Sequence, residues 1–384
     1  MGKKKTAKDV MEPHSKAKVD FYQKYLERYI SILVSTPFFK RINIFDVFCG
    51  RGLYEDGGHG SPLRAFDTIK DINSRIKHEK ELNLNLNDKC IAHLENVKAY
   101  IDPQNKDNCV CNVSYSNENA EELLDSLADV LKNTDKETRN LIFIDPYGYK
   151  YIHKDTLEKI MSNGYTEILL FLPISFMYRF SNYAVANTNS DSIKPLKEFI
   201  ESFFTKDHPI RIQEEMNVLE YIQYLTRAFS FGNKYYTTSY HIERDTNSYF
   251  ALFFFSSNIL GFNKILEVKW KLDEADGNGF NLPNDQYGLF DDIEAEEKKI
   301  YHYENLKSKL MSFLKEPKSN EQVFEFVLRN EYLPSHATPI LKELQAANRL
   351  SVIHICDKSE ARKGSFYISS DALKKQHVMI KIIS

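Results

Sequence analysis

The chain has 384 residues, of which 42% are hydrophobic, and a formal net charge of −3 at pH 7. This length allows two or three domains with buried cores. The charge excludes a protein that is basic throughout, so any nucleic-acid contact must rest on a local concentration of Lys and Arg.

The sequence shows no membrane-spanning segment, no signal peptide and no pattern of paired cysteines. No run of about 18 apolar residues exists, so no membrane span is expected. The Lys-rich N-terminus lacks the apolar stretch of a signal peptide. The five cysteines are odd in number and form no Cys-x-x-Cys pair, which favours a reduced, cytoplasmic compartment and predicts no metal site.

The first half of the chain predicts alternating helices and strands. Residues 1–12 are polar and basic, as in a flexible tail, and residues 14–33 have helical apolar spacing. A strand follows at 42–48, and Ser61 as N-cap with Pro62 in the first turn opens a helix to residue 76. Further strands are predicted at 82–88, 109–116, 141–144 and 167–172, and further helices at 92–100, 120–131 and 156–161. This alternation predicts a doubly wound, Rossmann-like parallel sheet.

The pattern changes after residue 173. Residues 176–230 are predicted to be a helical insertion, and strands at 235–241, 249–256 and 265–271 to close the sheet with an antiparallel edge. The first domain would therefore span residues 13–275. Residues 276–301 are rich in Asp and Glu and are predicted to form an acidic linker.

Residues 302–384 form a separate predicted domain. Helices are expected at 303–314, 320–328 and 337–347, followed by a hairpin of 350–355 with 364–369. Three helices and a β-ribbon indicate a winged helix-turn-helix.

The charge of this domain differs from that of the whole chain. It carries thirteen Lys or Arg and nine Asp or Glu, a balance of +4. Lys342 and Arg349, on or just after the recognition helix, and Arg362 and Lys363, at the wing, are predicted to contact nucleic-acid phosphates. The alternative is a dimerisation or partner-docking module.

The most informative motif follows the first predicted strand. Asp46 ends this strand. Phe48 follows it, and Gly50 and Gly52 then make a Gly-x-Gly turn. A dinucleotide site requires a third glycine and an immediate helix start, whereas here Glu55 and Asp56 follow. These acids would repel a pyrophosphate and would suit a cationic sulfonium, which favours S-adenosylmethionine (SAM) over NAD. The alternative is that the two glycines only make a turn.

Two polar residues follow the next strands. Asp88 lies where an acid binds the ribose hydroxyls in such sites, or it caps the next helix. Asn117 lies where an amide could meet the adenine amine, or it is an ordinary loop residue.

A second motif, Asp145-Pro146-Tyr147, ends another apolar strand about ninety residues later. The carboxyl ends of neighbouring parallel strands meet at one edge of a sheet, so the two motifs are expected side by side. A carboxylate and a backbone carbonyl can accept hydrogen bonds from a base amine as it becomes positively charged, and an aromatic ring can stack on an extruded base. The three residues are predicted to be catalytic; the alternative is a plain strand-to-helix turn.

Taken together, these stretches resemble the three-Cys-motif partner proteins (TcmP). The resemblance covers roughly residues 13–275. It rests on Lys18 with Tyr25-Leu26, Asp46–Gly52, Gly60-Ser61-Pro62, Asp145–Gly148, and Tyr249–Asn258 with Gly261 and Trp270. The chain departs from the family at Cys49, where the family has Ala.

The resemblance implies a SAM-methyltransferase fold, with Lys18 at the cofactor and a separate three-Cys-motif, radical-SAM-like protein as partner. A second similarity is to tRNA guanine-amino methyltransferases, which carry Asp-Pro-Phe-Gly. DNA amino-methyltransferases instead carry Asp-Pro-Pro-Tyr, and the second Pro is missing here.

These features predict a SAM-dependent N-methyltransferase that acts on an exocyclic amine of a DNA or RNA base. One alternative is a non-catalytic SAM-binding or scaffold subunit of the three-Cys-motif partner enzyme. Another is a winged-helix DNA-binding regulator whose Rossmann-like half senses a nucleotide. A fold alone does not decide between them.

Overall fold

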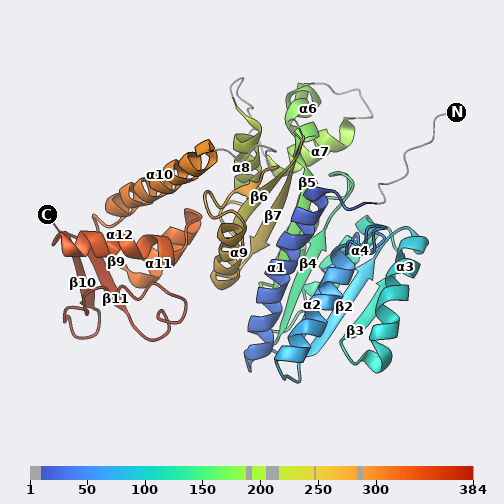
Figure 1. The fold of residues 1–384 in the computed structure, drawn as a ribbon, viewed down its shortest axis with the longest axis horizontal. Coiled ribbons are helices and arrows are strands. Elements are labelled where there is room, and N and C mark those ends of the chain that lie inside the picture. Colours follow the sequence, from blue (N-terminus) through green and yellow to red (C-terminus); the bar gives the residue numbers. More distant parts are fainter. Residues whose placement is uncertain (1–9, 187–192, 205–215, 246–247, 283–288, 384) are drawn as a thin grey trace. The chain divides into compact units, whose positions relative to one another are not determined.

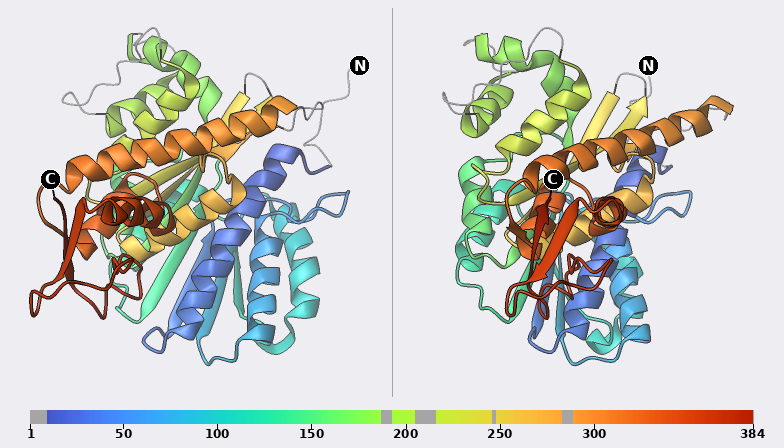
Figure 2. Two further views of the ribbon diagram at one scale, coloured as in Figure 1. Left: turned by 60° about the vertical axis from the view of Figure 1, so that its left-hand side comes forward. Right: turned by 90° about the vertical axis from the view of Figure 1, so that its left-hand side faces the viewer.

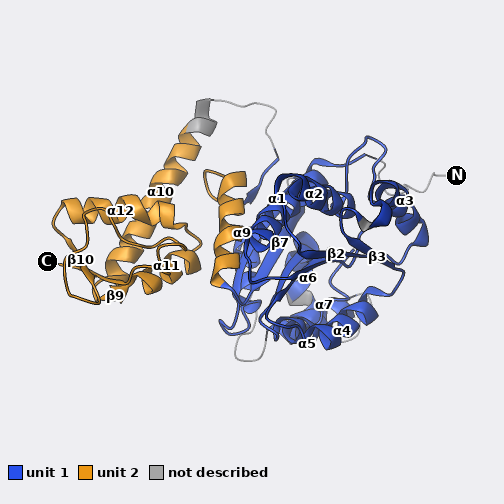
Figure 3. Cartoon of the chain, turned by 90° about the horizontal axis from the view of Figure 1, so that it is seen from below, with its two compact units in different colours: residues 1–258, 278–282 blue, residues 259–277, 283–384 orange. Residues whose placement is uncertain are grey.

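The structure is a computed structural model that describes residues 10–186, 193–204, 216–245, 248–282 and 289–383 (Figure 1). Residues 1–9 of the predicted tail lie outside this range. The chain divides into two compact units, residues 1–258 with 278–282, and residues 259–277 with 283–384 (Figure 3). Among the described helices, none combines the length and the apolar character that a membrane crossing requires.

An eight-stranded sheet forms the centre of the first unit, in the order β3-β2-β1-β4-β5-β7-β6-β8. Strands β1 to β5 are parallel, and β7 lies antiparallel between β5 and β6. The predicted mostly parallel sheet with an antiparallel edge is therefore confirmed. The strands are β1 (Arg41–Asp46), β2 (Glu81–Asn87), β3 (Asn112–Ser116), β4 (Thr138–Ile144), β5 (Thr166–Pro173), β6 (Tyr236–Asp245), β7 (Ser248–Ser256) and β8 (Gly279–Phe280).

Helices cover both faces of this sheet. Figure 3 shows α1, α2 and α3 on one side and α4, α5 and α7 on the other. Helices α6, α7 and α8 correspond to the helical insertion predicted at 176–230, although α6 begins two residues earlier, at Ile174. The helices of the first unit are α1 (Pro13–Ser35), α2 (Ser61–Arg75), α3 (Ile91–Ile101), α4 (Ala120–Leu131), α5 (Lys154–Met161), α6 (Ile174–Ala186), α7 (Lys194–Phe203) and α8 (Val218–Ala228).

The Asn-rich sequence of β2 has a structural explanation. Its leucines are buried on one face, and its asparagines point to the other face, as the two-residue period of a strand requires. There the amide of Asn112 donates to Asn83 (2.9 Å), Asn83 to Asn43 (2.9 Å), and Asn43 to Asn140 (2.8 Å). This ladder satisfies polar groups across four strands and fixes their register.

The second unit combines four helices with a small sheet. The sheet order is β10-β11-β9, and both pairings are antiparallel. Its core is formed by leucines of α10 together with apolar residues of α11, α12 and the strands. The elements are α9 (Ile259–Leu272), α10 (Leu289–Phe313), β9 (Lys318–Ser319), α11 (Asn320–Arg329), α12 (Pro334–Ala346), β10 (Leu350–His354) and β11 (Val378–Ile382).

Two strand predictions were wrong. Residues 265–271 belong to helix α9, where Phe262, Ile265, Leu266 and Lys269 are buried at helical spacing; the predicted window was too short to reveal that period. Residues 364–369 do not pair with β10, whose partner is β11. Phe366 and Ile368 nevertheless enter the core, so their alternation reflects burial rather than strand pairing.

Two further differences concern the starts of helices. Helix α10 begins at Leu289, inside the stretch predicted as an acidic linker, and its charges pair along the helix, as between Lys298 and Glu294 (2.9 Å). The N-cap of α2 is Gly60 and not Ser61, with Pro62 in the first turn as predicted.

Candidate functional site

The loop between β1 and α2 is shaped by its glycines. Gly50 and Gly52 have φ values of +64° and +73°, the left-handed region that favours glycine. A Cβ at Gly52 would lie 2.8 Å from Cγ2 of Val97, whereas a Cβ at Gly50 would meet no atom within 4 Å. The amide of Gly60 donates to the carbonyl of Gly52 at 2.6 Å. The loop therefore packs tightly at Gly52 and leaves open space beside Gly50.

Asp88 holds this loop from the neighbouring strand. Its carboxylate accepts hydrogen bonds from the amides of Gly50 (2.9 Å) and Cys90 (2.8 Å) and contacts His93 Nδ1 at 3.1 Å. Cys90 is the N-cap of α3. The geometry thus favours a helix-capping and loop-holding role for Asp88 over a ribose contact. Asn117 donates to the carbonyl of Asp88 (2.7 Å) and fixes the same turn.

Asp46, at the end of β1, is buried beneath the loop. Only 1% of its surface is exposed, and neither carboxylate oxygen has a hydrogen-bond partner of normal geometry among the described residues. Burial raises the pKa of Asp46 to about 7. The Ser61 hydroxyl is close enough to lower this pKa, and the charge of Asp145 raises it. Asp46 is therefore harder to ionise than an exposed aspartate.

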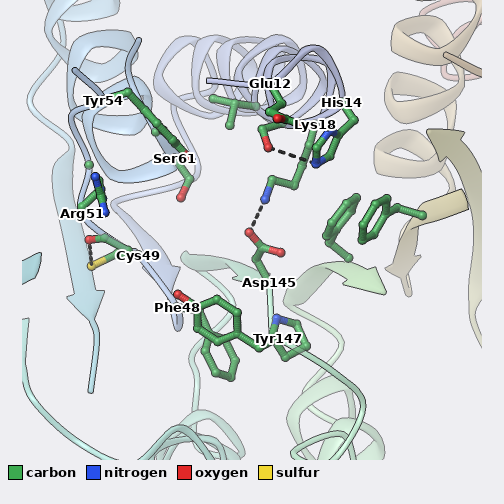
Figure 4. A pocket seen from close by; sticks show the side chains of 18 of the residues that line it. Glu12, His14, Lys18, Phe48, Cys49, Arg51, Tyr54, Ser61, Asp145 and Tyr147 are labelled. Carbon is green, nitrogen blue, oxygen red and sulfur yellow. Dashed lines mark hydrogen bonds and ion pairs between the residues drawn. The ribbon is translucent and has the colours of Figure 1, made fainter. Parts of the chain in front are cut away.

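Asp145, at the end of β4, has a different environment. It forms an ion pair with Lys18 of α1, and the two side chains are 20% and 15% exposed. Lys18 Nζ also lies 4.7 Å from the ring centroid of Phe171 on β5. Figure 4 shows Lys18 and Asp145 pointing toward one another, with Phe48 and Tyr147 on the Asp145 side. The pair places a carboxylate and an ammonium in one partly buried position.

A pocket of about 410 Å³ surrounds this ion pair. It lies between the Gly50–Gly52 loop and the Asp145-Pro146-Tyr147 turn, with Arg51 and Ser61 on one side and His14 on the other (Figure 4). The second side is a stack of rings: Phe250 lies 5.4 Å from His14 and 5.1 Å from Phe171, both nearly parallel to it.

Most of the predicted site residues meet in this pocket. Lining residues among them are Lys18, Phe48, Gly50, Gly52, Asp145, Pro146 and Tyr147. Asp46, Asp88 and Asn117 are not lining residues. Asp88 and Asn117 hold the loop and its neighbouring turn by hydrogen bonds, and Asp46 is buried beneath the loop. Tyr147 is 90% exposed, so its ring is free to contact a ligand at the pocket mouth.

Other lining residues were not among the predicted site residues, and they include His14, Arg51, Tyr54, Ser61, His93, Phe171, Arg244 and Phe250. The sequence contains information that could have identified some of these residues. His14 precedes Lys18 by four residues, which places both on one face of a helix. Phe250 is paired with Pro173 at the end of β5, but an antiparallel partner of β5 cannot be identified from strand patterns alone.

The four basic residues predicted to contact nucleic acid lie in the second unit and are exposed: Lys342, Arg349, Arg362 and Lys363. Gly364 donates its amide to Gln345 of α12 (2.8 Å), and a Cβ at Gly364 would lie 3.7 Å from Cε of Lys342. The loop after β10 therefore lies against α12, which brings Arg362 and Lys363 near Lys342. Within the described ranges, no group of three or more His, Cys, Asp or Glu side chains could hold a metal ion.

Neither a protein-family model nor a curated protein sequence matches the chain. Solved structures similar to it include the O-methyltransferase TomG from Streptomyces achromogenes in complex with SAM (10% identity, 63% of this chain, 87% of that chain, TM-score 0.32). Human methyltransferase-like protein 13 in complex with SAH is 13% identical over 73% of this chain and 99% of that chain (TM-score 0.32). An O-methyltransferase from Bacillus cereus with SAH is 13% identical over 61% and 80% (TM-score 0.31).

Proposed function

We propose that the protein is a SAM-dependent methyltransferase that acts on an exocyclic amine of a nucleic-acid base. The observation that carries the proposal is the pocket that joins the glycine loop after β1 to the Asp145-Pro146-Tyr147 turn after β4. Ligands of open α/β sheets bind at the carboxyl ends of adjacent strands. The sheet order and the antiparallel β7 are also those of Rossmann-like methyltransferases.

The residues present fit SAM. A volume of about 410 Å³ is within the range of small-molecule sites, and the open space beside Gly50 leaves room for a ligand against the loop. Lys18 and Arg51 would hold the carboxylate of the cofactor, and the aromatic stack would border its sulfonium. Bound there, SAM would supply an electrophilic methyl group.

The acceptor side is formed by the Asp145-Pro146-Tyr147 turn. The ion pair with Lys18 occupies Oδ2 of Asp145, so Oδ1 remains to accept a hydrogen bond from the base amine. The backbone carbonyl of Pro146 is a second acceptor. Both become stronger partners as the amine gains positive charge, which stabilises the transition state. Asp145 need not be a strong base, because the proton can leave after methyl transfer.

The second unit supports a nucleic-acid substrate. Its order of helix, strand, helix, helix, strand, strand supports the proposal of a winged helix, and we propose that Lys342, Arg349, Arg362 and Lys363 contact phosphates. The competing role is docking of the three-Cys-motif partner protein. Charge reversal at Arg362 and Lys363 should weaken nucleic-acid binding and flatten its salt dependence if the module contacts phosphates. Unchanged nucleic-acid binding with loss of the partner would favour docking.

A second candidate function is a non-catalytic SAM-binding subunit of that partner. The Lys18–Asp145 ion pair favours it, because the pair neutralises the carboxylate that the reaction needs. Calorimetry and turnover separate the two functions. SAM should bind at micromolar affinity and NAD hardly at all. Tight NAD binding without SAM binding would overturn both, and SAM binding without turnover on any nucleic acid would leave only the subunit role.

A further inference from the structure

A group of aromatic side chains, of which three are exposed and Tyr149 is half-buried, lies at the mouth of the pocket and beside it. We name Tyr147, Tyr149, Phe176 and Phe180 the aromatic platform. Tyr147 is 90%, Phe176 42% and Phe180 38% exposed. The rings of Tyr149 and Phe176 are 6.2 Å apart and nearly parallel, and Phe180 lies 4.7 Å from Phe176. Large apolar groups on a surface cost solvation free energy, and a contiguous set of them marks an interaction site.

The platform is connected along the chain to the acceptor side of the pocket. Tyr147 and Pro173 both line the pocket. Tyr149 follows Tyr147 by two residues, and α6, which carries Phe176 and Phe180 one turn apart, begins directly after Pro173. Figure 1 shows α6 beyond the carboxyl ends of β4 and β5. A polymer whose reacting group enters the pocket beside Asp145 would therefore pass over these rings.

The two segments that carry the platform are basic. Residues 146–154 and helix α6 contain Lys150, Lys154 and Arg179 and no Asp or Glu, although Asp145 and Asp155 flank the first segment. Lys150 and Arg179 are exposed. Exposed rings among basic side chains match a chain of flat bases joined by phosphates, because bases stack on the rings while phosphates attract the cations. The phosphates of a duplex could pair with the basic side chains, but the faces of its bases are stacked on one another and cannot reach the rings. An acidic peptide could also pair with the basic side chains, but its Asp and Glu side chains have no flat rings to stack.

We infer that the aromatic platform binds unpaired nucleotides next to the target base, so that the substrate is single-stranded nucleic acid or an unpaired loop. The methyl-transfer part of this inference rests on the proposed function. The binding part stands on the rings and charges alone. Stacking on any ring is tolerant of sequence, so the platform would hold the strand while the turn at Asp145 selects the amine.

The test measures binding of the full-length protein to a fluorescein-labelled single-stranded 12-mer of about equal base composition, and to its duplex, by anisotropy at one salt concentration. Stacking is worth about 1–3 kcal/mol per base, or about 5-fold or more in affinity. We expect Phe176→Ala and Phe180→Ala each to weaken single-strand binding at least about 5-fold. Phe180→Trp should retain it, because the larger ring still stacks.

Phe38→Ala is the matched control. Phe38 is 47% exposed and contacts one neighbouring ring, Phe39, at 5.4 Å, but it precedes the amino end of β1. This variant should bind within about 2-fold of the wild type. Equal affinity for duplex and single strand, or unchanged binding by both platform alanine variants while SAM binding shows them folded, would overturn the inference.

Turnover distinguishes this failure from failure of the proposed function. If the Phe176→Ala variant methylates a duplex at an undiminished rate, the inference about the aromatic platform is refuted and the proposed methyltransferase function is retained. If the single strand binds in a way that depends on the platform but no nucleic acid is methylated, the binding inference is retained and the proposed function is refuted.

Discussion

The acids that end β1 and β4 are similar in sequence and opposite in environment. Each follows an apolar strand and precedes a turn-forming motif. Asp46 is buried, lacks a regular hydrogen-bond partner among the described residues, and has a pKa of about 7. Asp145 is one-fifth exposed, pairs with Lys18 and lines the pocket. A strand-ending acid is thus buried beneath a loop in one place and accessible to a ligand in the other.

The difference arises from the path of the chain after each strand. After Asp46 the loop folds back over the strand end, where the amide of Gly60 binds the carbonyl of Gly52, and it covers the carboxylate. After Asp145 the chain runs through Pro146 and the exposed Tyr147, away from the strand end, and leaves the carboxylate accessible. Local turn geometry therefore decides which acid a ligand can reach.

The largest loss of activity is expected on substitution of Asp145, the accessible acid of the two. Asp145→Ala should lower kcat about 100-fold or more, because removal of one preorganised group that stabilises transition-state charge costs that much. SAM affinity should change only a few-fold. Steady-state kinetics with calorimetry measure both. The exposed Asp155→Asn at the start of α5 is the control, and near-normal turnover of Asp145→Ala on a confirmed substrate would refute the assignment.

The glycine loop allows the second test. Gly52→Ala forces a Cβ to 2.8 Å from Val97 at a φ of +73°, which should reduce the free energy of unfolding by about 1–3 kcal/mol and weaken SAM binding. Gly148→Ala is the matched control, since its Cβ would meet no atom within 4 Å. Urea unfolding of the two variants should separate them; equal stability would show that the loop adapts.

The third effect concerns stacking at the pocket mouth. Tyr147→Ala should weaken the transition-state complex with a nucleic-acid substrate by about 1–3 kcal/mol through lost stacking, and Tyr147→Phe should retain most of it. The ratio kcat/KM reports the loss. If the alanine variant matches the wild type, the base does not contact Tyr147.

The last expected effect is a pH dependence of stability. Burial raises the pKa of both Asp46 and Glu167 to about 7 in the folded state, from ordinary values near 4. The folded protein then holds protons that the unfolded chain has released, so stability should fall as pH rises from about 4 to 7 and change little above that from these groups.

Urea unfolding at several pH values measures this dependence. Each group contributes at most about 1.4 kcal/mol per pH unit. Asp46→Asn and Glu167→Gln should each reduce the slope between pH 5 and 7. A slope that neither variant alters would mean that these carboxyls ionise as in the unfolded chain.

Much of the first unit could be predicted from its sequence, because buried strands and amphipathic helices leave clear periodicities. Helix α4, for example, has the predicted bounds Ala120–Leu131. The two motifs also met as expected, since parallel strands place their carboxyl ends at one edge. The strand predicted at 265–271 was wrong because a short apolar run fits the period of a strand as well as that of a helix. Burial in the folded protein favours the helix, α9.

The site was less predictable where it depends on long-range pairing. The role of Asp88 follows from the position of the Gly50 amide, which sequence spacing cannot give. Burial of Asp46 depends on the path of the following loop. Phe250 enters the pocket because β7 is inserted antiparallel beside β5, and the aromatic platform requires α6 to meet Tyr149.

The most direct test of the central claim is mass spectrometry of nucleosides from bulk DNA and RNA of cells with the wild-type protein, without it, and with Asp145→Ala in its place. The proposed function predicts an N-methylated nucleoside that is present with the wild-type protein and absent in both other samples. Identical nucleoside profiles in all three, from cells shown to contain the wild-type protein and the variant at equal levels, would contradict it.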